Sequence, residues 1–462
     1  MKNLKRLNFA VLLLGFLFGF NGLKSQQIGN KNQLNLKEEN KVQILVDTDS
    51  IIAKNINNKL GINLNAGIDN DVNRNPNARP ISHALKKLGA KHLRFPGGKK
   101  SLYYVWSEPP HDNPSTARWV AKSYYNDASV NTINFDEFMA LCNEVGAQAH
   151  INVAYNPSEG LDEHLAAQWV KYANVTNNYD IKYWEIGNEM WQEELGFTTE
   201  SLAEVVKTYS KAMKAIDSTI KIGVSWKDQD DIIKATEGDL DFIAISNYLP
   251  QEQVIKSYQD YALGNNVNLS SVNSNLKLNT VVSEYNSISW IDDPWDKINV
   301  AGKGLMNFDL LGQLLSNNNC IYACYWNTRW FTDKGSIFDA LNDDNEILPA
   351  ALPLTLWAKF IEPNLVDITS NDQVIVPYAT NDSIEGNLVL FLINKGSVLK
   401  LADIDISSEF KYNKNAQLWQ YKALNENDMN PVLQKSGEVQ IQNNKITELE
   451  LPKISITVIV VN

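Results

Sequence analysis

The chain has 462 residues, of which 44% are hydrophobic and 21% charged, a composition typical of a globular protein with room for more than one domain. Its formal net charge of -12 disfavours nucleic acids and anionic membrane surfaces as partners, because both carry negative charge themselves. The 12 Trp, 18 Tyr and 15 Phe can fill a large core and can also supply rings on which sugars stack.

Cysteine and histidine usage gives no sign of a disulfide framework or a metal site. The three cysteines are Cys142, Cys320 and Cys324, and the last two lie four positions apart in a predicted strand, too far apart to bridge easily. The five histidines are scattered, without the paired spacing of a zinc site. We therefore expect no metal ion and no other cofactor.

The first 25 residues are typical of a secretory signal peptide. A positively charged start, MKNLKR, precedes an apolar run at 9–20 and a cleavage signal that ends at Ser25. The run is short for a membrane span, so we expect a secreted or periplasmic protein without membrane insertion after signal cleavage; the alternative is an uncleaved anchor. The polar segment 26–41 is predicted to be flexible.

The middle of the chain alternates between short apolar strands and amphipathic helical stretches. The helical stretches include 162–176 and 199–216, the second with Thr199 as its expected cap. The strands are LGINLNAG (60–67), KHLRFPGG (91–98), AQAHINVAYN (147–156), IKYWEIGNE (181–189), IKIGVSW (220–226), DFIAISNYLP (241–250), NTVVSEYNS (279–287) and CIYACYWNTRW (320–330). Eight such strand–helix units predict an α/β fold, a catalytic (β/α)8 TIM barrel over 60–362.

The last hundred residues follow a different pattern. Short strands such as GNLVLFLINK and ISITVIVVN are separated by turn residues, without long helices. This predicts a C-terminal antiparallel β-sandwich over 363–462. The segment 42–59, which begins VQILVDTD, precedes the barrel, and we expect it to contribute one or more strands to this sandwich.

Two predicted barrel strands end in carboxylates. Strand four ends in Asn188-Glu189 and strand seven in Ser283-Glu284. A TIM barrel places its active site at these strand ends, and glycoside cleavage needs two carboxylates, one to protonate the leaving oxygen and one to attack or to activate water. The alternative is that each is an ordinary surface or capping residue.

The stretches LRFPGG, WEIGNE and VVSEYN, in that order, resemble the retaining glycoside hydrolases of the large barrel clan, above all the α-L-arabinofuranosidase and heparanase-like β-glucuronidase families. The likeness covers nearly the whole chain after the signal peptide. It implies that Glu189 is the general acid/base, with a raised pKa, and that Glu284 is the nucleophile of a double displacement with retention.

The same resemblance suggests roles for neighbouring residues. Asn188 would bind the sugar hydroxyl beside the reacting carbon, Arg94 would orient the nucleophile, and Tyr248 would donate a hydrogen bond to it. Trp326 would form a stacking floor for a sugar ring. Asn247 stands where arabinofuranosidases favour histidine, and Glu-Tyr-Asn replaces their frequent Glu-Trp-Asn, so the match to arabinose as substrate is weaker than the match to the acid pair.

Several other residues keep two interpretations each. Strand-end polar groups either contact the substrate or are structural, and they are Asn65, Asn152 and Tyr155. Basic groups either bind an acidic or sulfated sugar or are ordinary loop charges, and they are Lys99, Lys100 and Arg329. Rings either wall subsites or pack the core, and they are Trp106, Trp191, Trp290 and Trp330. Glu185, four residues before Glu189, is expected near the barrel bottom in an internal salt bridge.

We thus expect a secreted retaining glycosidase that acts on a plant or algal polysaccharide or its oligosaccharides. A catalytically silent carbohydrate-binding protein on the same scaffold is the first alternative, and the presence of both Glu189 and Glu284 argues against it. A transglycosylase stays open, because the same covalent intermediate serves both reactions. A lyase is disfavoured, because no histidine stands at the end of a predicted strand.

Overall fold

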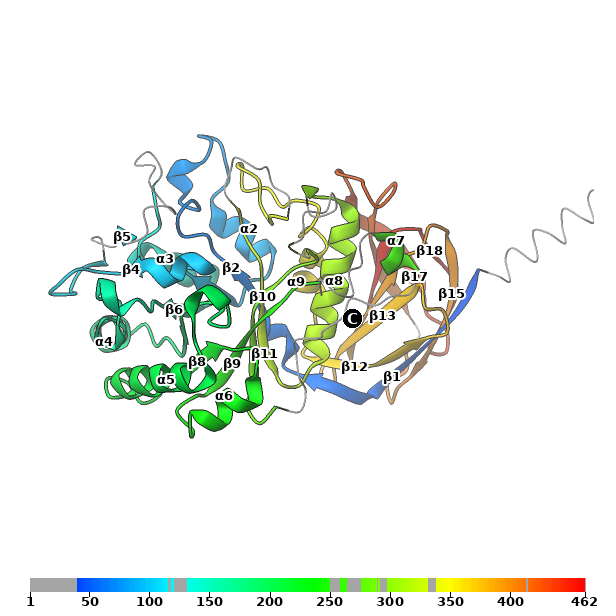
Figure 1. Cartoon of the computed structure of the whole chain (residues 1–462). Coiled ribbons are helices and arrows are strands. Elements are labelled where there is room, and N and C mark those ends of the chain that lie inside the picture. Colours follow the sequence, from blue (N-terminus) through cyan, green and yellow to red (C-terminus); the bar gives the residue numbers. More distant parts are fainter. Residues whose placement is uncertain are drawn as a thin grey trace, which may run out of the picture.

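The computed structural model describes residues 40–114, 118–119, 131–249, 258–263, 276–288, 290, 297–330, 338–412 and 414–461. The predicted signal peptide at 1–25 and nearly all of the predicted flexible segment 26–41 lie outside these residues. No helix in the described part of the chain is long and apolar enough to cross a membrane. Figure 1 shows a barrel with helices around it beside a domain made of β-strands.

Eight parallel strands close into a barrel, which confirms the predicted TIM barrel and each of its strands. In chain order they are β2 (Leu60–Asn63), β3 (His92–Phe95), β6 (Gln148–Val153), β7 (Tyr183–Ile186), β8 (Lys221–Ser225), β9 (Phe242–Asn247), β10 (Thr280–Tyr285) and β11 (Cys320–Tyr325). Their side chains alternate, so that Val281 packs inside the barrel and Val282 packs outside against the helices.

Helices surround these strands, and their caps and apolar faces are partly visible in the sequence. They are α2 (Ile81–Lys87), α3 (Phe135–Val145), α4 (Glu163–Val170), α5 (Thr199–Lys214), α6 (Gln229–Ala235), α7 (Tyr258–Ala262), α8 (Ala301–Ser316) and α9 (Leu354–Phe360). In α5, Thr198 and Ser201 form a capping box, so the prediction of Thr199 as the cap was wrong by one residue. Leu202, Val206 and Tyr209 form its buried stripe.

The C-terminal domain is a single curved sheet of nine strands in the order β17-β16-β19-β14-β13-β12-β1-β15-β18. Its strands are β1 (Lys41–Lys54), β12 (Asn364–Ser370), β13 (Ile375–Asp382), β14 (Asn387–Asn394), β15 (Lys400–Ser407), β16 (Asn415–Lys422), β17 (Val432–Gln440), β18 (Lys445–Leu451) and β19 (Ser455–Val461). The edge strands β17 and β18 approach each other, so the sheet encloses its own apolar core as a sandwich does. A short separate ribbon joins β4 (Tyr104–Val105) to β5 (Arg118–Trp119) beside the barrel.

The first described strand, β1, belongs to this C-terminal sheet although it precedes the barrel in the sequence. It pairs antiparallel with β12 and parallel with β15. In Figure 1 it is the blue strand among the orange and red ones. Val42, Ile44 and Val46 alternate along β1 and point into the core of the sheet.

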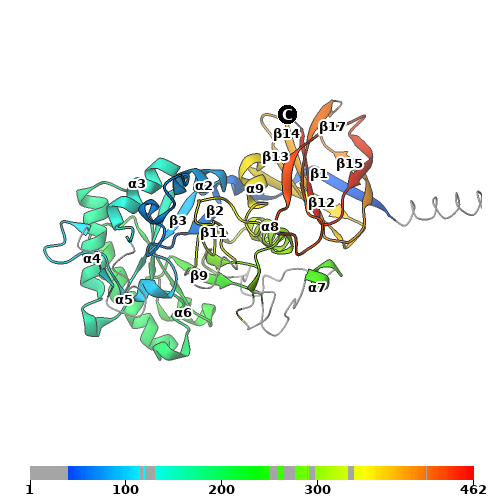
Figure 2. The same cartoon turned by 90° about the horizontal axis from the view of Figure 1, so that it is seen from above.

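The barrel and the sheet share a packed boundary. Along β14, Leu388 and Leu390 face the interior of the sheet domain, whereas Val389 and Phe391 join the core that continues into the barrel. Figure 2 shows α8 and α9 between the two parts. The Tyr378 hydroxyl donates a hydrogen bond of 2.6 Å to Asp309 on α8 across this boundary. The two domains are therefore joined through buried contacts.

Candidate active site

Glu284 lies at the mouth of the barrel because of an irregularity in its strand. Strict alternation after Val281 would point residue 283 inward and residue 284 outward. A register shift between Val282 and Glu284, opposite β9, resets the alternation and turns the Glu284 side chain into the mouth. The side chain is only 5% exposed there.

Two strong hydrogen bonds hold the Glu284 carboxylate. Arg94 Nη1 lies 3.0 Å from its Oε1, and the Tyr248 hydroxyl donates to its Oε2 over 2.6 Å. Burial raises the pKa of Tyr248 well above its ordinary value, so the phenol keeps the proton that it donates. The predicted contacts of Arg94 and Tyr248 with Glu284 are thus present in the structure.

Arg94 connects the layers of the barrel interior. Besides Glu284, its guanidinium donates to Glu185 Oε2 over 2.9 Å and to Asn188 Oδ1 over 2.8 Å. It also reaches Asn63 Oδ1 at the end of β2, over 3.0 Å. The side chain is 1% exposed, so all its hydrogen bonds are to protein groups that fix its plane. Asn188 therefore presents its oxygen to Arg94 and is held beside Glu284.

Glu185 forms the predicted internal salt bridge with Arg94 at 2.9 Å, and its Oε2 is hydrogen-bonded to His150 Nε2, also at 2.9 Å. Its predicted position near the barrel bottom is wrong, because the guanidinium that binds it also binds Glu284. The strand β7 ends at Ile186 and the chain then turns, so the rise toward Glu189 is smaller than an extended strand would give. Burial alone would raise the pKa of Glu185, but the charge of Arg94 and the His150 hydrogen bond hold it below its usual value.

Glu189 occupies a turn with unusual backbone geometry. Gly187 and Glu189 both have positive φ angles, of 67° and 45°, and the second is uncommon for a residue with a side chain. The turn is held by Gly187 N–H, which donates to Val153 O over 2.8 Å. Glu189 Oε2 accepts a hydrogen bond of 2.6 Å from Gln192, and the residue is partly exposed at the mouth. A side chain held in this way is rigid yet reachable.

The two carboxyl groups share an electrostatic environment. Burial raises the pKa of Glu284 to about 7, and the charge of Glu189 adds to the rise. Burial also raises the pKa of Glu189, which is the predicted direction. Each carboxyl group thus has a raised pKa, and the hydrogen bonds from Arg94 and Tyr248 favour the ionised form of Glu284.

The remaining strand-end residues divide into mouth and support positions. Asn247 is 1% exposed at the end of β9, next to Tyr248. Asn65 donates its amide to Arg329 O over 2.9 Å and is fully buried, which gives it a structural contact. Tyr155 packs its ring against Phe197, with the ring centres 5.3 Å apart. Asn152 donates to Gly187 O over 2.8 Å and so supports the turn that carries Glu189.

Among the predicted rings, those at the mouth differ greatly in exposure. Trp106 is fully buried and belongs to the core. Trp326 is 3% exposed, so its role as a stacking floor stays a prediction. Trp191 and Trp290 are 41% and 45% exposed. Trp290 lies 5.3 Å from the ring of Tyr248, which contacts Glu284, and Trp330 packs between Trp290 and Trp326.

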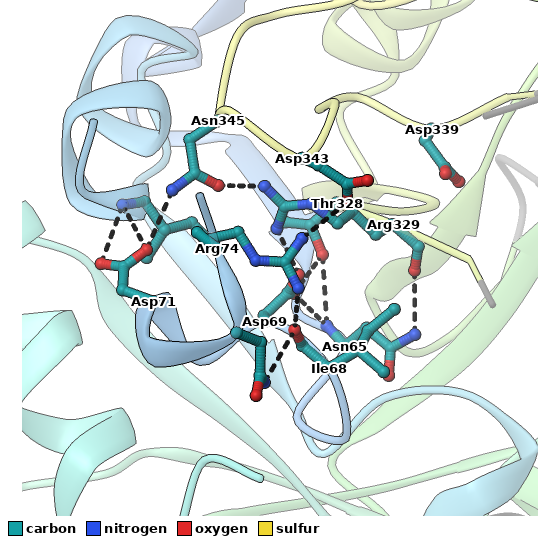
Figure 3. A network of polar contacts seen from close by, with 12 residues as sticks. Asn65, Ile68, Asp69, Asp71, Arg74, Thr328, Arg329, Asp339, Asp343 and Asn345 are labelled. Atoms are coloured by element: carbon teal, nitrogen blue, oxygen red, sulfur yellow. Dashed lines mark hydrogen bonds and ion pairs between the residues drawn. The ribbon is translucent and has the colours of Figure 1, made fainter. Parts of the chain in front are cut away.

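Arg329 is committed to a polar network that ties two loops of the mouth together (Figure 3). Its Nη1 lies 2.6 Å from Asp69 Oδ1, and its Nη2 donates to Asn342 O over 2.9 Å and to Asn345 Oδ1. Asn345 in turn donates to Asp71 over 2.9 Å. The guanidinium of Arg329 is thus occupied within the protein, which favours the structural interpretation over binding of an acidic sugar.

A cleft of about 550 Å³ opens on the side of Glu189. Trp191, two residues after Glu189, and Trp226, at the end of β8, form its aromatic walls. Ser246 and the first residues around α6 complete it. Trp226 was not among the predicted site residues, although it directly follows a barrel strand and the strand-end rule could have found it.

Metal ligation has no support in the described part of the chain, where no three His, Cys, Asp or Glu side chains are grouped so that they could hold an ion. The cysteines Cys142, Cys320 and Cys324 are buried and unbonded. The arrangement at the mouth is therefore one of carboxyl groups, their hydrogen-bond donors and aromatic rings. Such groups can transfer protons and attack an electrophilic carbon.

The chain is a TIM-barrel protein with an attached β-sandwich domain. Solved structures of arabinofuranosidases have the same fold. A structure described as an arabinofuranosidase matches with a TM-score of 0.70 and 16% identity, over 91% of this chain and 100% of that one. The α-L-arabinofuranosidase of Thermotoga maritima, solved with arabinose, matches with a TM-score of 0.68 and 16% identity, over 91% and 99%. At these identities the likeness shows the fold alone.

Sequence comparison adds a resemblance within the barrel. Residues 84–267 match the family model described as Alpha-L-arabinofuranosidase 1 domain. "Probable alpha-L-arabinofuranosidase C" of Aspergillus clavatus is 30% identical over 166 residues, 31% of this chain and 31% of that protein. "Intracellular exo-alpha-L-arabinofuranosidase" of Bacteroides ovatus is 26% identical over 152 residues, 30% and 29%. The chain thus matches less than a third of the length of these curated relatives.

The predicted resemblance to α-L-arabinofuranosidases is confirmed over this segment. The segment contains Arg94, Asn188 and Glu189 but ends before Glu284. The pairing of Glu284 with Glu189 therefore rests on the fold, which places both at one mouth.

Proposed function

We propose that the chain is a retaining glycoside hydrolase in which Glu189 is the general acid/base and Glu284 the nucleophile. The observation that carries the proposal is the difference between the two carboxyl environments. Glu284 accepts hydrogen bonds from Arg94 and Tyr248, which favour an ionised nucleophile. Glu189 accepts one from the neutral Gln192 side chain and is partly exposed, which suits a proton donor that must reach the leaving oxygen.

The proposed reaction proceeds by double displacement. Glu284 attacks the anomeric carbon of the sugar while Glu189 gives its proton to the leaving oxygen, and a covalent glycosyl-enzyme forms. Glu189, now ionised, takes a proton from water, and the resulting hydroxide displaces Glu284 with net retention. Arg94 compensates the charge of Glu284 before attack and after release. Asn188 stays beside the nucleophile, where its amide can reach the neighbouring sugar hydroxyl.

The substrate that we propose is a plant or algal polysaccharide or an oligosaccharide derived from it. The relatives named as arabinofuranosidases support a carbohydrate substrate. The cleft between Trp191 and Trp226 lies on the side of Glu189, where the leaving group departs, and it is large enough to hold further sugar units.

The signal-like N-terminus supports a further part of the proposal, that the enzyme acts outside the cytoplasm. Cell fractionation of a producing strain, with N-terminal sequencing of the extracellular or periplasmic protein, tests it. Recovery of the protein only from the cytoplasm with residues 1–25 still attached would contradict it.

Leaving-group chemistry tests the two catalytic roles separately. We expect Glu284→Gln to lose more than about 1,000-fold in kcat on every glycoside, since no other group can attack. Glu189→Gln should lose comparably on a natural glycosidic bond but far less on a dinitrophenyl glycoside, whose leaving group needs no proton, and added azide should restore its turnover.

The stereochemistry of the first product, followed by NMR, should show retention at the anomeric carbon. Undiminished activity of Glu284→Gln, or a product of inverted configuration, would contradict the mechanism. Binding of glycans without any turnover by the wild type would favour the silent carbohydrate-binding alternative.

A further inference from the structure

Lys100 is a buried lysine at the barrel mouth. It lies in the 3₁₀ helix Lys99–Tyr103, directly after β3, and is 4% exposed. Its neighbour Lys99 has a side chain that is 39% exposed and forms an ion pair with Glu194. Two consecutive lysines therefore have opposite environments, and the surface interpretation fits Lys99 alone.

The position of Lys100 depends on a close contact between two loops of the mouth. Gly98, with a φ of 65°, precedes the 3₁₀ helix, and a Cβ there would lie 2.3 Å from the Trp326 ring. Only glycine allows both this backbone conformation and this approach. The indole thus fits under the turn, and Lys100 Nζ stands 5.8 Å from its ring centre.

The ammonium of Lys100 has no carboxylate at ion-pair distance in the described part of the chain. The nearby acids are already used, because Glu284 pairs with Arg94 and Asp69 pairs with Arg329. Burial lowers the pKa of Lys100 to about 8, although Asp69 and Glu284 act to raise it. A buried cation without a paired anion is costly, which is why such groups usually mark a ligand site.

Buried polar side-chain atoms without a partner occur on Trp326, whose ring faces Lys100, and on the residue after it. The indole N–H of Trp326 has no acceptor, and both polar side-chain atoms of Asn327 are buried without a partner, within the described residues. Buried polar atoms of folded proteins nearly always have partners, and an oxygen-rich group from outside the chain could accept from both the indole N–H and the ammonium.

We propose that Lys100 binds a negatively charged substituent, a carboxylate or a sulfate, on the sugar that Glu284 attacks. This inference rests on the proposed glycosidase function and narrows its substrate to acidic sugars. The backbone N–H of Trp326 donates to Tyr285 O over 2.9 Å, and the indole packs in one apolar cluster with Tyr248, the hydrogen-bond partner of Glu284. The indole and Lys100 therefore lie on the Glu284 side of the mouth. Carboxylate and sulfate share the anionic oxygens that an ammonium recognises.

The positive charge of Lys100 can compensate the repulsion between an acidic sugar and Glu284. An acidic sugar that approaches the Glu284 carboxylate is repelled by it, and repulsion between buried like charges is strong because water does not screen it. Lys100 offsets this repulsion from a fixed position, and it does so for the acidic sugar alone. A neutral sugar gains at most a hydrogen bond from the ammonium and no charge compensation, so the residue favours acidic over neutral sugars.

Calorimetric binding of single sugars to the full chain tests the inference without turnover. The probes are D-glucuronate and D-galacturonate for the carboxylate, glucose 6-sulfate for the sulfate, and L-arabinose and D-glucose as neutral sugars. We expect at least one acidic probe to bind the wild type about tenfold or more tightly than the neutral ones, and Lys100→Met to remove about 10- to 100-fold of its affinity. Lys99→Met should bind like the wild type, and Lys100→Arg should retain most of the affinity.

Each other outcome overturns the inference. Neutral sugars that bind as tightly as acidic ones, no binding of any acidic probe, or an equal loss for both classes in Lys100→Met would each reduce Lys100 to a supporting charge. Thermal melting distinguishes a structural role of Lys100 from a binding role. If the ammonium stabilises the fold, Lys100→Met should lower the melting temperature; if it is unpaired, the melting temperature should not fall. The fate of the proposed function is read separately, from Glu189→Gln and Glu284→Gln.

Discussion

At the scale of single residues, the site is organised by Arg94. One guanidinium contacts the carboxylates of Glu185 and Glu284 and the amide oxygens of Asn63 and Asn188. His150 is neutral in this cluster, because burial lowers its pKa, so Glu185 balances the charge of Arg94 and leaves the guanidinium as a rigid donor. The proposed nucleophile, Glu284, is consequently oriented by groups that cannot move independently.

The pH profile of kcat/KM should report this arrangement. Glu284 must be ionised to attack, and its pKa of about 7 means that activity should fall below neutral pH, about tenfold per unit. The Tyr248 hydrogen bond stabilises the ionised form and lowers that pKa. Tyr248→Phe should therefore shift the acidic side of the pH profile upward by roughly one to two pH units, as measured from initial rates across pH.

Tyr183→Phe, at the opposite end of the barrel, serves as the control for this shift. An unchanged acidic side of the profile in Tyr248→Phe would contradict the assignment of that pKa to Glu284.

At the scale of elements, sequence reasoning succeeded where buried strands are apolar on both faces. All eight barrel strands have this character, and β10 is buried at every position. In the sheet domain, β14 and β19 were predicted for the same reason, whereas β15 and β18 were missed because charged residues on their outer face interrupt the apolar pattern.

The site was predictable as a set of strand ends but not as a geometry. The rule that active groups follow barrel strands led to the prediction of Arg94, Glu189 and Glu284 as site residues. It could not show that a bulge turns Glu284 inward, since a register shift depends on the neighbouring strand. Nor could it separate Lys99 from Lys100, whose burial depends on a ring 226 residues away, at Trp326.

The loop after β7 and the start of α6 form the cleft beside Glu189, and a substitution there should depend on the leaving group. If Trp191 stacks on a leaving sugar, Trp191→Ala should lose about tenfold in kcat/KM on an oligosaccharide and little on the nitrophenyl glycoside of the same sugar. Trp290, equally exposed but beside Tyr248, is the matched comparison, and Trp290→Ala should affect both substrates alike. The measurement is kcat/KM of each variant on both substrates. An equal loss on the two substrates in Trp191→Ala would mean that the cleft does not bind the leaving group.

At the scale of the whole molecule, the barrel and the sheet are expected to unfold together. The strand β1 lies between β12 and β15 and thereby holds the two halves of the sheet in one piece. The outer face of β14 continues the barrel core, with Phe391 ring to ring against Trp357 of α9 at 4.2 Å. Damage to the sheet core should therefore reach the site through α8 and α9, although no strand of the sheet carries a mouth residue.

Two adjacent positions on β1 test this coupling. Ile44 is fully buried in the sheet core, and its neighbour Leu45 is 56% exposed. Ile44→Ala should lower the free energy of unfolding by about 2–5 kcal/mol, whereas Leu45→Ala should change it by less than about 0.5 kcal/mol. Thermal melting followed by tryptophan fluorescence and by residual activity should show one shifted transition for Ile44→Ala in both signals, with kcat unchanged below it. A separate early transition, with activity persisting until a later one, would mean that the sheet unfolds alone and that the shared core does not couple the domains.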